Sequence, residues 1–99
     1  MVRRAPPDDY VIETLLPDLV GHDRSPSAFL VYLKLWYACG GPDGRGASLS
    51  LQMLAAETGL SKSSIQSAIR RLKRRGYLVA TNPTPTAIPA YKVRAPWRS

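Results

Sequence analysis

The sequence has very little of the chemistry on which enzymes and metal proteins rely. It contains one cysteine, Cys39, and one histidine, His22, which lies beside Asp23 in a polar stretch where we expect a surface loop. A lone cysteine excludes an internal disulfide and suits a reducing compartment. One cysteine and one histidine also exclude the usual four-ligand zinc site within a single chain. We therefore expect no metal site.

The acidic residues and the glycines do not indicate catalysis either. All seven acids lie at or before Glu57, and they are scattered without a convincing pair. The glycine-rich stretch over residues 40–46 lacks the Lys-Ser/Thr ending and the preceding strand of a phosphate-binding loop. The sequence predicts a protein that is not an enzyme and that needs no cofactor.

The chain also lacks a long apolar run. Its longest one, residues 28–39, is interrupted by Lys34 and falls short of the ~20 residues that a membrane span needs. The basic start leads into prolines and aspartates instead of an apolar stretch, so no signal peptide is expected. A chain of 99 residues suits one domain, and we expect a cytoplasmic protein.

Acidic residues are missing altogether from the last part of the chain. Residues 61–99 carry nine basic side chains and no acid, whereas residues 1–60 carry five basic and seven acidic ones. Such asymmetry gives one side of a molecule a positive field that suits a polyanion such as nucleic acid. The alternative is a solvated face that only keeps the protein soluble.

Serines, glycines and helical spacing predict three helices. Ser25 is placed to cap the first, which should run from Pro26 to about residue 39. Ser50 is placed to cap the second helix, and Ser61 the third. Gly59 and Gly76 stand where the second and third helices should end. The third helix, expected over 61–75, has an apolar stripe made of Ile65, Ala68, Ile69 and Leu72.

The remaining segments predict a small sheet and two terminal extensions. Strands are expected at 77–81 and 90–95, with a short third one at 47–49. Residues 1–9 should form a flexible arm, 10–96 the domain and 97–99 a tail. Residues 9–20 should pack on the domain as a short strand or an irregular segment broken at Pro17. Trp97 is left with three alternatives: the edge of the core, a dimer interface or solvent.

The first helix is apolar on nearly every side. Val31, Leu35 and Ala38 face away from the expected core positions and need separate cover. Either the N-terminal segment lies over them or a second copy of the chain does. A homodimer could form through this face of the first helix or through the N-terminal segment. These two possibilities stay open at this point.

Ala55, Gly59 and Ile65 have the spacing of two helices that cross at a glycine-containing turn. The stretches "DYVIETLLPDLV", "SPSAFLVYLKLW" and "SLQMLAAETGLSKSSIQSAIRRLKRRGYL" resemble the winged helix-turn-helix family, as found in small bacterial regulators and in the N-terminal domains of plasmid and phage replication initiators. The resemblance covers about residues 10–95. It implies a mainly α fold: a three-helix core plus a small β-hairpin or a two- or three-stranded antiparallel sheet.

The family resemblance also implies that the third helix enters the major groove of DNA. An α-helix fits that groove, and its first turns read the bases. The candidates for base contacts are Ser63, Gln66, Ser67 and Arg70. The candidates for phosphate contacts are Ser61, Lys62, Arg71, Arg74, Lys92 and Arg94. The wing tip departs from the family pattern, because Asn82, Thr84 and Thr86 stand among prolines without any charge.

The resulting hypothesis is sequence-specific binding of double-stranded DNA, as in a transcriptional regulator. A symmetric dimer would read two half-sites ~10 base pairs apart. One alternative is the DNA-binding domain of a replication initiator or a fragment of a longer protein. Another is a winged-helix module that binds a protein, for which the first helix and not the third would matter.

Overall fold

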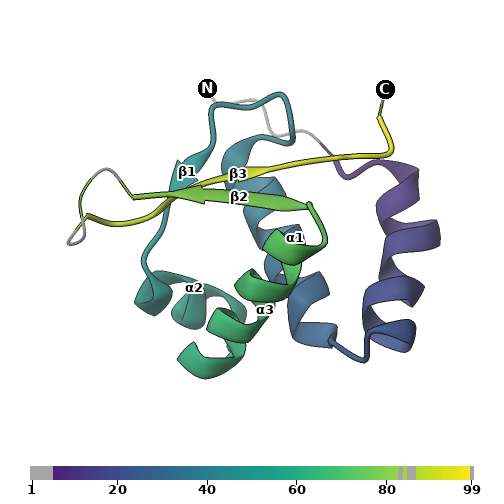
Figure 1. Ribbon diagram of the computed structural model, residues 1–99, viewed down its shortest axis with the longest axis horizontal. Coiled ribbons are helices and arrows are strands. Elements are labelled where there is room, and N and C mark those ends of the chain that lie inside the picture. Colours follow the sequence, from purple (N-terminus) through teal and green to yellow (C-terminus); the bar gives the residue numbers. More distant parts are fainter. Residues whose placement is uncertain (1–5, 83, 85–86, 99) are drawn as a thin grey trace.

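The computed structural model describes residues 6–82, 84 and 87–98 (Figure 1). Its elements are two helical segments, η1 (Val11–Leu15) and η2 (Asp18–His22), helix α1 (Pro26–Cys39), strand β1 (Ala47–Ser48), helices α2 (Leu51–Thr58) and α3 (Lys62–Arg74), and strands β2 (Leu78–Thr81) and β3 (Ala90–Val93). The fold is mainly helical with a small three-stranded antiparallel sheet, which confirms the predicted winged helix-turn-helix. None of the helices in the described part of the chain has the length and apolar character that a membrane crossing requires.

Two of the three predicted serine caps form hydrogen bonds. The Ser50 hydroxyl accepts one from the amide of Met53 at 3.1 Å, and the Ser61 hydroxyl accepts one from the amide of Ser64 at 3.2 Å. Each bond satisfies an amide that has no partner inside its helix. Ser25 differs, because its side chain makes no capping bond, and its backbone carbonyl alone accepts from Ala28. Gly59 ends α2 in the left-handed conformation, at a φ of 79°.

The apolar stripe of α3 is buried as predicted. The side chains of Ile65, Ala68 and Leu72 are fully buried, and that of Ile69 is nearly so. They face α1, against which α3 packs, and α2 and β2 contact the same helix. Burial of each large apolar side chain contributes about 1.5–3 kcal/mol. The opposite side of α3 therefore has to face solvent.

The sheet has the strand order β1-β3-β2. Tyr91 and Val93 point to the helices and are buried, whereas Lys92 between them points the other way. The strands are shorter than predicted, since β3 ends at Val93, although the amide of Arg94 still bonds the carbonyl of Tyr77 at 2.9 Å. Gly46 allows β1 to approach β3, because a Cβ there would lie 2.6 Å from the Tyr91 carbonyl oxygen.

The N-terminal segment is helical, so the expected short strand or irregular segment is wrong. Val11, Leu15 and Leu19 recur every four residues, and all three are buried, as on one side of a helix. The backbone bonds here span five residues, for example from the Asp23 amide to the Asp18 carbonyl at 2.8 Å. Pro17 does not break the segment, because it stands at the start of η2 with a helical φ of −65°.

The N-terminal helical segment supplies the missing cover for α1. η2 packs against α1, and Figure 1 shows the two running side by side. Val31 and Leu35 are fully buried, and Ala38 is half-buried against the same core. A homodimer interface through Val31 and Leu35 is therefore wrong, because the chain buries these side chains itself.

The two ends of the chain meet at Trp97. The indole Nε1 of Trp97 donates to the Asp8 carboxylate at 2.9 Å. Its ring stacks on Tyr10, with 4.5 Å between ring centroids, and lies parallel to Trp36 at 6.4 Å. Of the three alternatives for Trp97, the edge of the core is the one observed. Asp8 lies within the expected flexible arm, yet its carboxylate is bound by Trp97. Residues 1–5 of that arm and Ser99 lie outside the described residues.

We predict that Leu35→Ala destabilises the folded chain without changing its oligomeric state. Leu35 is fully buried, so its truncation should lower the free energy of unfolding by about 2–5 kcal/mol. Leu30→Ala on the same helix is the matched control, because Leu30 is 46% exposed and should change that energy by less than about 0.5 kcal/mol. Urea unfolding and sedimentation measure the two quantities. A Leu35→Ala variant as stable as the wild type would contradict the described packing.

Candidate nucleic-acid interface

The solvent-facing side of α3 carries all four candidates for base contacts. Ser63, Gln66, Ser67 and Arg70 are exposed. They stand opposite the buried stripe because a helix advances 3.6 residues per turn. The structure thus brings this predicted set together on one surface, the cationic side of α3, defined by its exposed residues: Ser61, Lys62, Ser63, Gln66, Ser67, Arg70, Lys73 and Arg74.

Three serines gather at the start of this side. The Ser61 hydroxyl lies 3.2 Å from that of Ser63 and 3.0 Å from that of Ser64, in addition to capping the helix. The first amides of a helix and the positive end of its dipole attract anions. Ser61 therefore has a structural role as a cap, and it also stands where a phosphate would be favoured.

Arginine and lysine side chains follow on the next turns. The Arg70 guanidinium donates to the Ser67 hydroxyl at 3.2 Å, so each of these two base-contact candidates orients the other. Arg70, Lys73 and Arg74 line a shallow hollow of the surface. None of Lys62, Lys73 and Arg74 is paired with an acid in the described part of the chain. Their charge is therefore available to a ligand.

Arg71 and Arg75 are not available in the same way, because aspartates of the N-terminal segment bind them. The Arg75 Nη1 donates to both Asp23 carboxylate oxygens at 2.8 Å, and its Nη2 bonds Asp18. The Arg71 Nη1 lies 3.4 Å from Asp23, whose side chain is only 6% exposed. Arg71, expected among the phosphate contacts, is thus directed at a carboxylate of its own chain.

The ion pairs between the aspartates and these arginines shift the pKa values of Asp23 and Arg75. Burial of Asp23 raises its pKa, but the hydrogen bond from His22 and the charges of Arg75 and Arg71 outweigh that and hold the pKa below its ordinary value of 3.8. The hydrogen bonds with Tyr77 and Asp18 raise the pKa of Arg75 further above its ordinary value. The pairing therefore ties the N-terminal segment to the end of α3.

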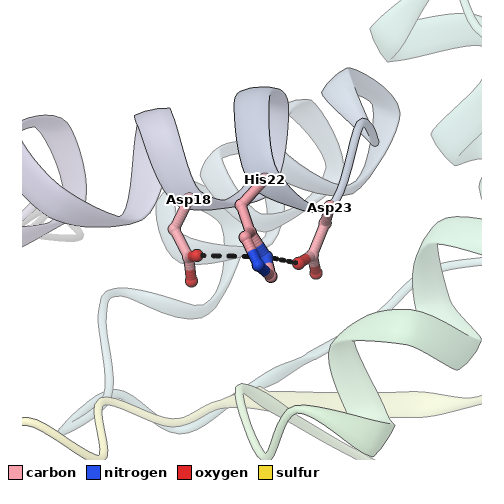
Figure 2. A group of neighbouring side chains, drawn as sticks. All are labelled: Asp18, His22 and Asp23. Carbon is pink, nitrogen blue, oxygen red and sulfur yellow. Dashed lines mark hydrogen bonds and ion pairs between the residues drawn. The ribbon is translucent and has the colours of Figure 1, made fainter.

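Asp18, His22 and Asp23 form a cluster that the sequence did not reveal. Figure 2 shows the imidazole between the two carboxylates, with its Nδ1 3.9 Å from Asp18 and 3.2 Å from Asp23. These groups are close enough to hold a metal ion. The guanidinium of Arg75 already pairs with both carboxylates, however, so the cluster serves as an ion-pair site for arginine. Its sequence signal is the helical i, i+4 spacing of Asp18 and His22.

The remaining phosphate candidates lie elsewhere. Lys92 of β3 and Arg94, just after it, are both exposed and alternate with the buried Tyr91 and Val93, so they face away from the helices. At the wing, Asn82 Nδ2 donates to the Ala87 carbonyl at 3.3 Å and so braces the base of the loop. Thr86 of the predicted tip lies outside the described residues, as do Pro83 and Pro85. The structure does not bring Lys92 and Arg94 to the cationic side of α3.

One comparison with known proteins bears on this arrangement. A family model described as a helix-turn-helix domain matches residues 25–78, which is more than half of the chain. The matched part begins at the cap of α1 and includes all of α2 and α3. No curated protein and no solved structure gave a match.

We predict that Asp23→Asn weakens the folded state in a pH-dependent way. Losing a charge-assisted bond to Arg75 should lower the free energy of unfolding at pH 7 by about 1–3 kcal/mol. Because folding lowers the pKa of Asp23, its contribution is fully present above 3.8 and is lost as the pH falls through the lower folded value. The difference between variant and wild type should therefore shrink in acid.

Urea unfolding at pH 7 and at successively lower pH measures this difference. Asp9→Asn serves as the control, since Asp9 is exposed and makes no ion pair among the described residues. A constant difference between wild type and Asp23→Asn across the whole acid range would contradict the assigned pairing.

Proposed function

The chain belongs to the helix-turn-helix domain family, and we propose that it binds double-stranded DNA in a sequence-specific way with α3 in the major groove. One observation carries the proposal: the solvent-facing side of α3 combines polar side chains with cations that no acid of the described chain neutralises. The major groove admits an α-helix and displays a distinct pattern of donors and acceptors for each base pair. The cations on this side of α3 suit the negative charge of DNA, and its polar side chains suit the donors and acceptors of the bases.

Ser63, Gln66, Ser67 and Arg70 are the residues proposed to read bases. Gln66 matches the donor and acceptor of adenine, and Arg70 matches the two acceptors of guanine. The hydrogen bond to Ser67 holds the Arg70 guanidinium over the exposed side before any ligand arrives. Less side-chain entropy is then lost on binding, which favours affinity.

Ser61, Lys62 and Arg74 are the residues proposed to hold phosphates. They stand at the two ends of α3, on either side of the base-reading residues. Contacts at both ends fix how the helix lies in the groove, although they carry no sequence information. Arg71 contributes less than these, because Asp23 competes for its guanidinium.

Occupancy of a DNA site is the proposed mechanism of regulation. The protein would act in the cytoplasm of a bacterial cell, where a bound chain blocks or recruits other machinery at a promoter. Support comes from the family match together with the cations exposed on α3.

We predict that Lys62→Ala, Arg70→Ala and Arg74→Ala, made together, abolish salt-dependent DNA binding. The wild type should bind a mixed-sequence duplex at ~50 mM salt and lose roughly 10³–10⁵ in affinity by ~200 mM, if it makes 6–10 phosphate contacts. The triple variant should bind weakly at both salt concentrations. Fluorescence anisotropy with a labelled duplex measures both affinities.

Arg24→Asn is the control for lost positive charge. Arg24 is exposed, is not part of the cationic side of α3 and has a φ of 52°, which asparagine tolerates. Its affinity should stay close to that of the wild type. Equal binding by the wild type and the triple variant would show that α3 does not contact the DNA. No binding by the wild type at low salt would leave a protein partner as the alternative.

Single substitutions should separate base readers from phosphate contacts. Gln66→Ala and Arg70→Ala should cost about 1–3 kcal/mol on a preferred site and much less on unrelated DNA. Lys62→Ala should weaken binding to all sequences alike and reduce the salt slope by about one. Site selection from a random duplex pool, followed by titration of each variant, measures these effects. A uniform loss for Gln66→Ala would contradict its proposed role.

A further inference from the structure

The sheet has a second basic surface, separate from the cationic side of α3. Its outer face, the side turned away from the helices, carries Lys92 and Arg94. Arg45 adds a third cation from the loop between α1 and β1. In Figure 1 this loop arches over one side of the sheet, while α2 and α3 lie on the other side. We call the surface formed by Arg45, Lys92 and Arg94 the outer sheet face.

The outer sheet face is hollowed and positively charged. One hollow, of about 690 Å³, lies along Lys92 and Arg94 and extends to Arg75 and Gly76 at the end of α3. A second, of about 300 Å³, lies between Arg45 and Lys92, so the two share the lysine. Asp43 also lines the first hollow, but its carboxylate accepts from Arg98 at 3.1 Å. Arg45, Lys92 and Arg94 have no acidic partner among the residues described.

The outer sheet face and the cationic side of α3 face different directions. Leu78, Tyr91 and Val93 bury the inner side of the sheet against the helical core. A duplex on the exposed side of α3 therefore lies beyond that helix, with α3 and the core between it and the outer sheet face. The buried layer between the helices and the inner side of the sheet thus turns the two surfaces in different directions.

We propose that the outer sheet face binds the phosphate backbone of a second segment of double-stranded DNA while α3 holds the first. This inference rests on the proposed function of α3. The protein then bridges two DNA segments, one read through its bases and one held through charge. A regulator of this kind brings a distant or neighbouring segment of DNA to its own site.

The chemistry of the outer sheet face favours a duplex backbone over other polyanions. Lys92 and Arg94 are two residues apart on extended chain, hence roughly 7 Å apart, which is close to the distance between neighbouring phosphates of one DNA strand. Both can contact phosphates of the same strand. The ring of Tyr91 is buried, so this face offers no aromatic side chain for stacking the bases of a single strand.

A bridging assay tests the proposal. The protein is mixed with two duplexes of about 12 base pairs, just over one helical turn, one labelled with a donor dye and one with an acceptor. Energy transfer reports bridging, anisotropy reports binding of one duplex, and sedimentation reports the oligomeric state. The variant Arg45→Gln, Lys92→Gln, Arg94→Gln removes three charges from the outer sheet face. Lys62→Gln, Lys73→Gln, Arg74→Gln removes three from α3 as the matched control.

The wild type should bridge the two duplexes. The outer-face variant should keep binding one duplex and lose bridging by about tenfold or more at low salt. The α3 variant should lose binding of the single duplex. All substituted side chains are exposed, and circular dichroism confirms that both variants fold.

Three results would overturn the second surface and leave the proposed function standing. In the first, the wild type binds one duplex without bridging. In the second, the outer-face variant bridges as well as the wild type, because two associated chains each hold one duplex. In the third, the outer-face variant loses single-duplex affinity as strongly as the α3 variant, so that one duplex touches both surfaces. Failure of the wild type to bind any duplex would instead overturn the proposed function itself.

Discussion

The amphipathic character of α3 is the constraint on which the rest of the structure depends. Ile65, Ala68 and Leu72 are fully buried, and their burial against α1 fixes how the helix is rotated about its axis. Polar and cationic side chains must then face solvent, since charged groups are costly to bury. The same packing turns the apolar residues of β2 and β3 toward the helices. One hydrophobic contact thus determines both the candidate DNA surface and the orientation of the sheet.

Ion pairs between distant segments decide which cations remain free. Asp18 and Asp23 neutralise Arg75 and draw Arg71 toward the N-terminal segment. Elsewhere, Lys34 pairs with Glu57 at 2.6 Å, and Arg98 pairs with Asp8 at 2.6 Å. These acids, all at or before Glu57, therefore cancel particular basic residues instead of lowering the charge evenly. Among the described residues, unpaired cations gather on the exposed side of α3 and on the outer sheet face.

Local patterns predicted most of the helical core. The Ser50 and Ser61 caps, the left-handed Gly59 and the stripe of α3 each depend on residues within a few positions of one another, and all are observed. The N-terminal segment differs from the expected short strand or irregular segment, because Pro17 stands at the start of η2 instead of breaking the chain. The four-residue repeat of Val11, Leu15 and Leu19 was the signal that would have identified it as a helix.

The amino-acid sequence by itself determined the two sides of α3, because helical periodicity is a local property that needs no partner. Only the tertiary structure decided that Arg71 donates to Asp23, 48 residues away, and that Trp97 donates to Asp8, 89 residues away. It also decided that Lys92 and Arg94 face away from α3. Contacts over such separations depend on how whole elements pack, and no spacing along the chain encodes that packing directly.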